Sequence, residues 1–332
     1  MEYREYSGEP WVIPMLVEAY PRPLSGEEMA QERGVTRKAA WKAVQRVRRE
    51  GLSVTSSRKG YFLREVPDVL WPGTLDVLLQ DSAPWLNVMY HASCASTNTL
   101  TKDCARAGEK EGTLVVTEHQ HAGRGREERG WFSLPGKSLT FSLLLRPCSP
   151  STESRSLPLL AAHSLAEALE KELGIFPRLK WPNDLLLEEK KVAGLLFESS
   201  IRAGMTDWVV LGVGVNVNLS KEDFPDALRD KATSLSLNAG QNIARYRVMR
   251  SFLAVFWNNY RDWKKSPGFS RWETTYLSRL AWVGNMVEVR WADNSVKGRL
   301  VGVDGEGALV VETAEGNKKY YWGEASLLSA DV

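Results

Sequence analysis

The pattern of apolar residues changes twice along this chain, which argues against folding around one continuous core. The 332 residues are 43% hydrophobic, and single cores rarely grow beyond about 250 residues. Residues 1–65 have the spacing of short helices, residues 66–282 mix strand-like runs with amphipathic segments, and residues 283–332 hold short strands between turns. The sequence therefore predicts an α+β protein of three domains with these boundaries.

The first domain is strongly basic. Residues 33–64 contain ten Lys and Arg residues and one Glu, a local net charge of +9 in a chain whose total is +2. Such an excess is typical of nucleic-acid-binding modules, because neutralising phosphates dominates their affinity. The alternative is a basic helical hairpin that is merely solvated.

Local patterns in this domain predict a winged helix-turn-helix. Ser25 and Glu28 have the spacing of a capping box, and Thr36 precedes a second helix that ends at Gly51. The stretch LSVTSSRKGYFL then alternates around a turn, as the hairpin of a wing does. The second helix of such a motif enters the major groove. The residues expected to contact DNA, on this helix and at the wing tip, are Arg37, Lys38, Lys42, Arg58 and Lys59.

Residues 66–76, VPDVLWPGTLD, contain two prolines and a glycine and are interpreted as the interdomain linker. The alternating strand-like and amphipathic runs that follow predict a mixed domain with one main sheet. Within it, WVVLGVGVNVN could be an edge strand that pairs two molecules or an interior strand. The tail, with its Asn-Ser, Asp-Gly and Glu-Gly turns, predicts a small β-barrel.

Composition argues against several classes. The chain has neither a run of about 18 apolar residues nor a basic leader before an apolar run, so we expect a cytoplasmic protein without a membrane segment. Cys94, Cys104 and Cys148 lack the spacing of a disulfide framework or a zinc site. His119 and His121 could share one strand face, but no third ligand lies near them. We therefore expect no metal site made by the protein.

Residues 118–131, EHQHAGRGREERGW, have neither helix nor strand periodicity. The arginines Arg124, Arg126 and Arg129 cannot all pack against a core, and the glycines between them add backbone freedom. The sequence therefore predicts a flexible loop that closes on an anion.

Residues 180–199, KWPNDLLLEEKKVAGLLFES, predict two apolar strands around the turn EEKK. Lys191 starts the second strand, where it can point inward while Lys190 points to solvent. Taken alone, a lysine in such a place is usually a surface charge.

Four motifs together resemble those of biotin protein ligases. They are STN (96–98), QHAGRGR (120–126), KWPNDLLLEEKKVAGLL (180–196) and GVGVNVN (212–218), in the order and approximate spacing of that family. With the basic N-terminal segment, the chain resembles the bifunctional type, in which the ligase is also the biotin operon repressor. This resemblance covers essentially the whole chain. It implies a central domain similar to class II synthetases and an SH3-like β-barrel at the C-terminus.

The reaction implied by the resemblance joins the biotin carboxylate to the α-phosphate of ATP and releases pyrophosphate. The biotinyl group then passes to a lysine of a biotin carboxyl carrier protein. Mg²⁺ is expected on the phosphates, and a ligand-bound homodimer is expected on the biotin operator DNA. Because two anions must meet, positioned cations have to offset their repulsion. In the family the GRGR loop closes over the adenylate and keeps water away.

The same resemblance assigns roles to single residues. Lys191 matches the essential lysine of the family, and Arg126 is expected to be catalytic with it. Biotin is expected to contact Ser96, Thr97, Asn98, Gln120, Arg124, Gly125, Arg126 and Lys191. The nucleotide is expected to contact Arg124, Arg126, Arg129, Trp131, Asn183 and Asn216. Residues 223–237 correspond to a segment that orders over the adenylate in relatives.

Three positions depart from the family pattern. Ala95 replaces the usual Asp before STN, and Glu128 replaces a Gly, which predicts a stiffer and more acidic loop. Leu328 stands where some members have an Arg that reaches the nucleotide domain, so contact between the C-terminal module and ATP is less expected. Two other functions are weighed beside the bifunctional ligase. One is a lipoate or octanoyl transferase of the same superfamily, and the other is a ligand-sensing repressor without turnover.

Overall fold

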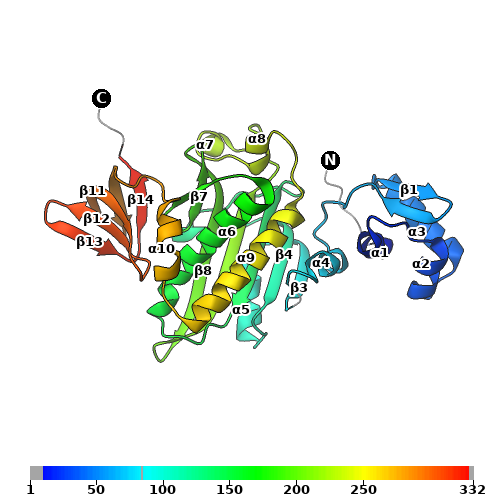
Figure 1. The fold of residues 1–332 in the computed structure, drawn as a ribbon, viewed down its shortest axis with the longest axis horizontal. Helices are drawn as coiled ribbons and strands as arrows, with labels where there is room; N and C mark the ends of the chain where they lie inside the picture. The colour runs from blue at the N-terminus through cyan, green and yellow to red at the C-terminus, as the bar shows by residue number, and fades with distance from the viewer. Residues whose placement is uncertain (1–9, 84, 329–332) are drawn as a thin grey trace.

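The computed structural model describes residues 10–83 and 85–328, which form three sheets in a row along an elongated molecule (Figure 1). A two-stranded sheet lies in the N-terminal module, a seven-stranded sheet forms the centre, and a five-stranded sheet lies in the C-terminal module. Figure 1 places the two small modules at opposite ends, with the central sheet between them. In the described part of the chain, no helix combines the length and apolarity needed to cross a membrane.

The N-terminal module is the predicted helix-turn-helix with a wing. Its elements are α1 (Val12–Ala19), α2 (Gly26–Arg33), α3 (Arg37–Arg49), β1 (Val54–Ser57) and β2 (Gly60–Leu63). The capping box forms as expected: the Ser25 hydroxyl accepts the Glu28 N–H at 3.0 Å, and the Glu28 carboxylate accepts the Ser25 N–H at 2.7 Å. The two strands of the wing pair from Val54 opposite Leu63 to Ser57 opposite Gly60. The sequence did not predict α1, which contains a proline.

The apolar stripe of α3 builds the core of this module. Ala40, Val44 and Val47 are each 0% exposed and pack with α1 residues such as Ile13 and Leu16. Because these residues recur on one side of the helix, the opposite side is left to solvent. The amphipathic pattern thus decides which residues of α3 can meet a partner.

The central domain is built on the single sheet that the sequence predicted. The sheet order is β3-β4-β5-β9-β8-β7-β6, and only β3 and β4 run parallel. Its strands are β3 (Asn87–Cys94), β4 (Thr113–Gln120), β5 (Ser138–Leu145), β6 (Arg178–Lys180), β7 (Asp184–Leu187), β8 (Lys190–Arg202) and β9 (Met205–Asn216).

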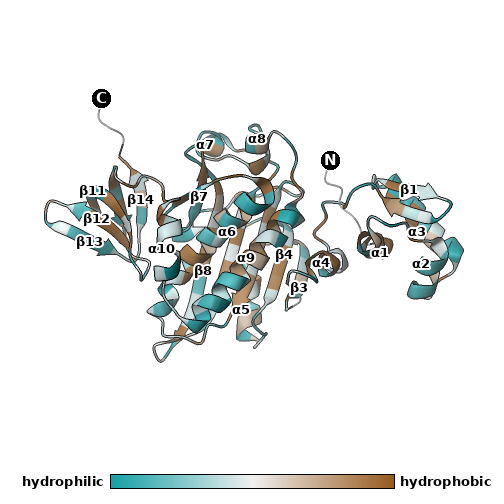
Figure 2. Ribbon diagram, viewed as in Figure 1, coloured by the Kyte–Doolittle hydropathy of each residue, from teal (hydrophilic) through white to brown (hydrophobic). Residues whose placement is uncertain are grey.

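Helices cover both faces of this sheet. The helices of the central domain are α4 (Pro72–Leu79), α5 (Thr97–Arg106), α6 (Leu157–Leu173), α7 (Asp226–Arg229), α8 (Leu235–Ala239), α9 (Arg245–Lys265) and α10 (Ser270–Leu277), with short 3-10 helices at Arg126–Glu128 and Glu153–Ser156. Among them α5, α6 and α9 contact strands of the sheet. The long helices α6 and α9 lie side by side over one face (Figure 1). In Figure 2 the strands beneath them are brown and much of the outward helix surface is teal, which marks the buried core. The strand β5 is buried along its whole length, as a strand covered on both faces must be.

The run WVVLGVGVNVN lies in an interior strand. It belongs to β9, which pairs with β5 along one side and with β8 along the other. Both edges of β9 therefore already have a partner strand, so β9 cannot pair with the same strand of a second molecule. Its apolarity is explained by burial within one chain.

The segment predicted as a linker is packed. After an extended stretch, α4 begins at Pro72, inside the predicted linker. Trp71 belongs to the core of the N-terminal module, whereas Leu70 and Leu75, both 0% exposed, belong to the central core. Apolar side chains within this segment therefore pack against both cores.

The C-terminal module is an antiparallel sheet of order β13-β12-β11-β10-β14. Its strands are β10 (Met286–Trp291), β11 (Asn294–Val303), β12 (Leu309–Thr313), β13 (Gly316–Tyr320) and β14 (Glu324–Leu327). The expected Asn-Ser turn is wrong by two residues, because Asn294 and Ser295 are paired in β11. The turn is formed by Ala292 and Asp293, with Ala292 at a φ of 47°.

Replacing Ser25 by Ala removes one half of the capping box. We expect the free energy of unfolding of the N-terminal module to fall by about 1 kcal/mol, because α2 loses the acceptor for an orphan amide. Urea titration followed by circular dichroism measures this change. Ser25→Asp keeps a capping oxygen and serves as the control; equal destabilisation by both variants would contradict the role of the cap.

Candidate functional site

A cavity of about 600 Å³ opens in the central domain, a size ordinary for small-molecule sites. Its wall combines the start of α5, the loop between β4 and β5, and inward residues of β8 and β9. All residues that the resemblance assigned to biotin or nucleotide line this cavity: Ser96, Thr97, Asn98, Gln120, Arg124, Gly125, Arg126, Arg129, Trp131, Asn183, Lys191 and Asn216. The fold thus brings together motifs that lie far apart in the sequence.

One end of the cavity is a buried polar network at the start of α5. The Thr97 N–H and hydroxyl donate to Gln120 Oε1 at 2.8 and 3.1 Å. The Ser142 hydroxyl donates to Asn98 Oδ1 at 2.6 Å. A Cβ at Gly212 would lie 2.1 Å from the same Asn98 oxygen, so only glycine fits there. This end therefore holds amide and hydroxyl groups in fixed orientations.

A carboxylate behind this network, that of Glu198, orients Asn98 and also holds two cations. Glu198 accepts from Asn98 Nδ2 at 2.9 Å and from Lys102 Nζ at 2.7 Å, and lies 3.7 Å from Arg124 Nη2. Burial alone would raise the pKa of Glu198, but the hydrogen bonds from Lys102 and Asn98 outweigh it and lower the pKa below its usual value. Glu198 is therefore an anion that fixes the Asn98 amide.

The arginine loop is closed on itself, which differs from the flexible loop expected. The Trp131 N–H donates to the Gly123 carbonyl at 2.9 Å, and the Gly125 N–H donates to the Arg129 carbonyl at 2.6 Å. A Cβ at Gly123 would lie 2.6 Å from the Trp131 carbonyl oxygen. This glycine permits close approach of two backbones rather than adding freedom. The side chain of Glu128, expected to stiffen the loop, lies outside the described residues.

The three loop arginines are held by partners in this structure. Arg124 donates to the Thr99 hydroxyl at 3.1 Å. Arg126 donates to the Gly323 carbonyl at 2.8 Å, and Arg129 pairs with Glu324. Two of the three arginines thus contact the C-terminal module.

The C-terminal module reaches the cavity despite Leu328. Glu324, at the start of β14, lines the cavity and pairs with both Arg129 and Lys180. Burial would raise the pKa of this carboxyl, but hydrogen bonds from Arg129 and Lys180 lower it to about 2. Leu328 made contact between this module and the cavity less expected. Glu324 makes that contact instead.

Lys191 points inward, as its strand position predicted. Its Nζ lies 2.7 Å from Asp184 Oδ1 and 5.6 Å from the centre of the Trp131 ring. The Trp131 ring lies against the backbone of β8 and β9, because a Cβ at Gly214 would approach it to 2.4 Å and a Cβ at Gly194 to 3.2 Å. Trp131 Nε1 is buried and has no hydrogen-bond partner among the described residues. The cavity wall therefore brings together a lysine cation, a carboxylate and an indole N–H without a partner among the described residues.

The two asparagines expected near the nucleotide donate hydrogen bonds to backbone carbonyls in this structure. Asn183 donates to the Leu195 carbonyl, and Asn216 donates to the Thr233 carbonyl at 3.0 Å. The segment 223–237 is already ordered beside them, since the Thr233 N–H donates to the Lys191 carbonyl at 2.9 Å. Part of that segment, including Phe224, lines the cavity.

Sequence reasoning missed several carboxylates of the site. The sequence analysis assigned no role to Asp184, Glu198 or Glu324, and the fold shows the cation that each of them holds. Asp184 could have been found, because it shares the KWPND motif with Lys180. No cluster of three His, Cys, Asp or Glu residues suited to a metal occurs within residues 10–83 and 85–328.

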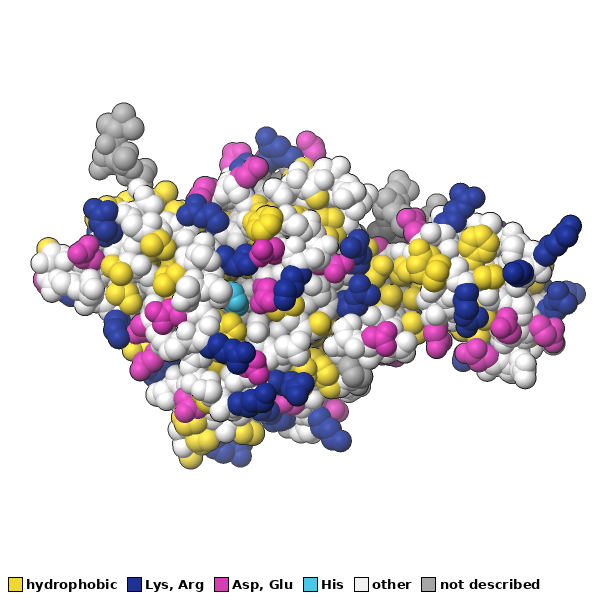
Figure 3. Space-filling view, viewed as in Figure 1, with side chains coloured by type: hydrophobic (Ala, Val, Ile, Leu, Met, Phe, Trp, Pro, Cys, Tyr) yellow, Lys and Arg dark blue, Asp and Glu magenta, His cyan; other side chains and the backbone are white. Residues whose placement is uncertain are grey.

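A second surface lies on the N-terminal module. The predicted DNA contacts Arg37, Lys38 and Lys42 are exposed on α3, and Arg58 and Lys59 form the exposed turn of the wing. Figure 3 shows Lys and Arg side chains spread around this end of the molecule. Trp41, 50% exposed on the same helix, was not expected from sequence. Arg48 instead holds the wing, donating to the Val54 carbonyl at 2.9 Å.

Comparison with known proteins agrees with this arrangement. The biotin/lipoate A/B protein ligase family matches residues 90–216, a helix-turn-helix domain matches residues 12–62, and the biotin protein ligase C terminal domain matches residues 283–328. The bifunctional ligase/repressor BirA of Bacillus subtilis (strain 168) is 36% identical over 92% of this chain and 94% of its own length. This chain belongs to the family of bifunctional biotin ligase/repressors.

Other members of the family agree. BirA of Escherichia coli (strain K12) is 31% identical over 92% of this chain and 94% of its own length. The solved structure of the biotin protein ligase from Aquifex aeolicus in complex with biotin and ATP is similar with a TM-score of 0.64 at 32% identity, covering 74% of this chain and 99% of that one. The family resemblance expected from the four motifs is confirmed.

The closed state of the arginine loop can be tested without a ligand. In Gly123→Ala the new Cβ would meet the Trp131 carbonyl at 2.6 Å and break the hydrogen bond beside it. We expect trypsin to cut after the loop arginines about tenfold faster, as for loss of one such hydrogen bond. Gly130→Ala is the matched control, because its Cβ would meet nothing closer than 4.0 Å. Equal cleavage of both variants would contradict the closed loop.

Proposed function

We propose that this protein is an ATP-dependent biotin protein ligase that forms biotinyl-5′-AMP and transfers biotin to a lysine of a biotin carboxyl carrier protein. The observation that carries this proposal is the position of Lys191 in the cavity. Its Nζ lies 5.6 Å from the centre of the Trp131 ring, in the same cavity that the amide and hydroxyl network around Asn98 lines. A cation at this junction suits a reaction in which a carboxylate and a phosphate must meet.

The two ends of the cavity suit the two substrates. We assign the biotin ring system to Ser96, Thr97, Asn98 and Gln120, because a cyclic urea needs a few fixed donors and acceptors. We assign adenine to the face of Trp131, with Asn183 and Asn216 beside the nucleotide. The loop residues Arg124, Gly125, Arg126 and Arg129 would close over the phosphates.

The reaction proceeds in two displacements. An oxygen of the biotin carboxylate attacks the α-phosphorus of ATP, the bond to the β-phosphate oxygen breaks, and pyrophosphate leaves with the electron pair. A lysine amine of the carrier protein then attacks the biotinyl carbonyl carbon, AMP leaves, and the amine loses a proton. In both steps Lys191 offsets the negative charge that gathers at the α-phosphate, and Arg126 acts with it.

Loop closure requires the arginines to exchange partners. Arg129 is 56% exposed at its side chain and pairs with Glu324, while Arg126 donates to a carbonyl. The guanidinium of Arg129 is therefore open to a ligand, and phosphate oxygens can replace these partners by supplying charged hydrogen bonds of their own. The C-terminal module would then be released from the loop as the nucleotide is gripped.

Mg²⁺ is proposed to enter with ATP. Asp184 and Glu324 line the cavity, and each is already paired with a lysine. These residues fit an ion whose oxygen ligands come mainly from phosphates and water. Bound in this way, it would neutralise phosphate charge.

The two alternative functions are less well supported. A lipoate or octanoyl transferase would share the central fold, but the relatives that match almost this whole chain are bifunctional ligase/repressors. A sensor without turnover would not need Lys191 held on Asp184 beside the cavity. The repressor activity is proposed in addition to the ligase, because the helix-turn-helix precedes the catalytic domain in one chain.

Repression is proposed to use all three domains, divided at 1–65, 66–282 and 283–332. Arg37, Lys38 and Lys42 would reach the major groove, while Arg58 and Lys59 meet phosphates. One winged helix makes few contacts, so a homodimer formed on ligand binding is proposed to occupy the biotin operator. The protein would act in the cytoplasm, where ATP, carrier protein and operator DNA are present together.

Replacing Lys191 by Ala tests the ligase. We expect adenylate formation to slow by about 10²–10³, the loss typical of one such stabilising group, while the fold is kept. Pyrophosphate release from ATP in the presence of biotin measures the rate. Lys190→Ala, on the adjacent residue of the same strand, should retain the wild-type rate. A wild-type rate in Lys191→Ala would remove this lysine from the reaction.

DNA binding tests the repressor. Anisotropy titrations against the region upstream of the organism's own biotin synthesis genes should show specific binding only when biotin and ATP are both present. Lys38→Ala should weaken this binding at low salt, since it removes a groove cation. Equal binding with and without the two substrates would reduce the N-terminal module to a non-specific anchor.

A further inference from the structure

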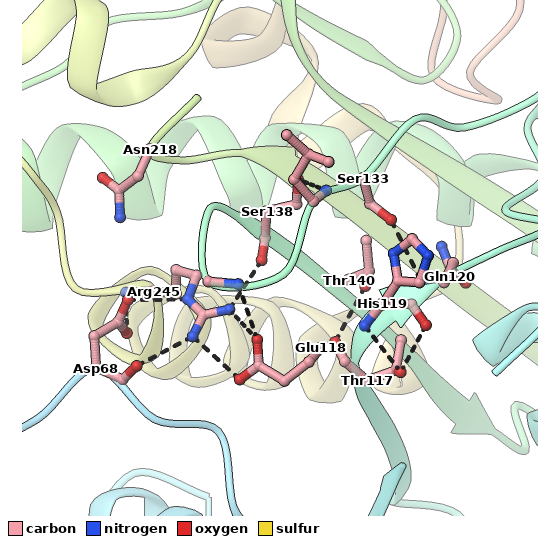
Figure 4. Close-up of polar contacts among 12 residues, drawn as sticks. Asp68, Thr117, Glu118, His119, Gln120, Ser133, Ser138, Thr140, Asn218 and Arg245 are labelled. Atoms are coloured by element: carbon pink, nitrogen blue, oxygen red, sulfur yellow. Dashed lines mark hydrogen bonds and ion pairs between the residues drawn. The ribbon is translucent and has the colours of Figure 1, made fainter. Parts of the chain in front are cut away.

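An ion cluster with a buried arginine at its centre joins the N-terminal linker to the catalytic sheet. Arg245, the first residue of α9, is 1% exposed and lies between Asp68 and Glu118 (Figure 4). Its Nε donates to Asp68 Oδ2 at 2.9 Å, while Nη1 and Nη2 donate to Glu118 at 2.6 and 3.2 Å. Removing one partner of such a cluster leaves an uncompensated buried charge, which is strongly unfavourable. These three residues are therefore held in one arrangement.

Every N–H of the guanidinium has an acceptor. Beyond the two carboxylates, Nη1 donates to the Ser138 carbonyl at 3.3 Å and Nη2 to the Asp68 carbonyl at 3.1 Å. Asp68 Oδ1 also accepts the backbone N–H of Arg245 at 2.7 Å, so it caps α9. Burial opposes the charge of Arg245, but Asp68 and Glu118 outweigh it and raise the pKa of the guanidinium.

The partners of Arg245 stand at both bases of the arginine loop. Glu118 lies near the end of β4, just before the loop, and Ser138 is the first residue of β5, just after it. Glu118 Oε2 also accepts the Gly136 N–H at 3.2 Å, within the returning arm of the loop. One buried side chain thus ties the outgoing and returning ends of residues 121–137 together.

The other side of the cluster belongs to the N-terminal module. Asp68 lies five residues after the end of β2, the second strand of the wing. Three residues later Trp71 enters the core of that module, and α4 packs on α1. The segment that carries Asp68 is therefore held by the core of the winged helix through Trp71 and by the catalytic domain through Arg245.

We propose that Asp68 and Arg245 are positioning residues that couple the arginine loop to the winged helix. Closure of the loop on the adenylate and the DNA-binding arrangement of the N-terminal module then favour each other. This inference rests on the ligase and repressor functions proposed above. Because such coupling is reciprocal, DNA must strengthen adenylate binding by the same factor by which adenylate strengthens DNA binding.

The first test needs neither ligand nor DNA. In Asp68→Ala we expect the amides of Gly125 and Trp131 to exchange with deuterium about tenfold faster, because the loop bases lose a charged hydrogen-bond network. Glu65→Ala is the matched control, since it removes an exposed carboxylate from the same segment. Asp68→Asn keeps an oxygen for the Arg245 N–H and should give a smaller acceleration. Unchanged loop exchange in both Asp68 variants would overturn the proposal.

The second test follows the adenylate itself. Full-length protein is loaded with radiolabelled biotin and MgATP, and release of the labelled adenylate is followed after a chase with unlabelled biotin. We expect about tenfold faster release from Asp68→Ala, a higher KM for biotin and a nearly unchanged kcat, as for a group that acts through the loop. Glu65→Ala should match wild type. Equal release from Asp68→Ala and wild type would also overturn the coupling.

The two proposals can fail separately. If wild-type protein makes no adenylate, the ligase function is contradicted, while the exchange measurement still decides whether Asp68 holds the loop. If adenylate forms, adding the upstream DNA should slow its release from wild type and leave Asp68→Ala unaffected. A DNA effect of equal size in both proteins would contradict the role of Asp68.

Discussion

The site depends on positive charges that are held in place before any substrate arrives. Lys191 is paired with Asp184, Lys180 and Arg129 with Glu324, and Arg124 lies beside Glu198. Each carboxylate keeps a cation oriented, so the cavity wall does not repel itself. A reaction that joins two anions needs cations with low reorganisation cost, and this arrangement supplies them.

Exposure separates the charges that can change partners from those that cannot. The loop arginines are partly exposed, and a ligand that supplies charged hydrogen bonds can replace their ion-pair partners. Arg245 is buried with all its donors satisfied, so its bonds to Asp68 and Glu118 persist. The exchangeable pairs of the loop arginines are suited to binding a ligand. The persistent cluster around Arg245 is suited to coupling a movement of one domain to the other.

The two terminal modules contact the catalytic domain around the same loop. The C-terminal module contacts the arginines of the loop through Gly323 and Glu324. The N-terminal linker is joined to the bases of the loop indirectly, because Asp68 binds Arg245, which in turn binds Glu118 and Ser138. Glycines at tight positions make this possible, because a Cβ at Gly123 or Gly214 would collide with Trp131. The loop is thus the element through which all three parts of the chain can respond to one ligand.

Much of the local structure followed from the sequence. The capping box at Ser25, the buried stripe of α3 and the inward position of Lys191 rest on side-chain periodicity and short-range hydrogen bonds, which a sequence displays directly. The linked motifs also indicated which residues share one site. The exact position of a turn was harder to predict. The turn expected at Asn294 and Ser295 lies two residues earlier in the chain.

Only the tertiary structure decided which charges act together. Asp68, Glu118 and Arg245 come from three distant segments, and nothing in their local sequence distinguishes them from solvated residues. The interior place of β9 and the partners of Arg126 and Arg129 likewise depend on segments far along the chain. Sequence patterns report periods and short spacings, whereas burial of an ion pair is a property of the packed molecule.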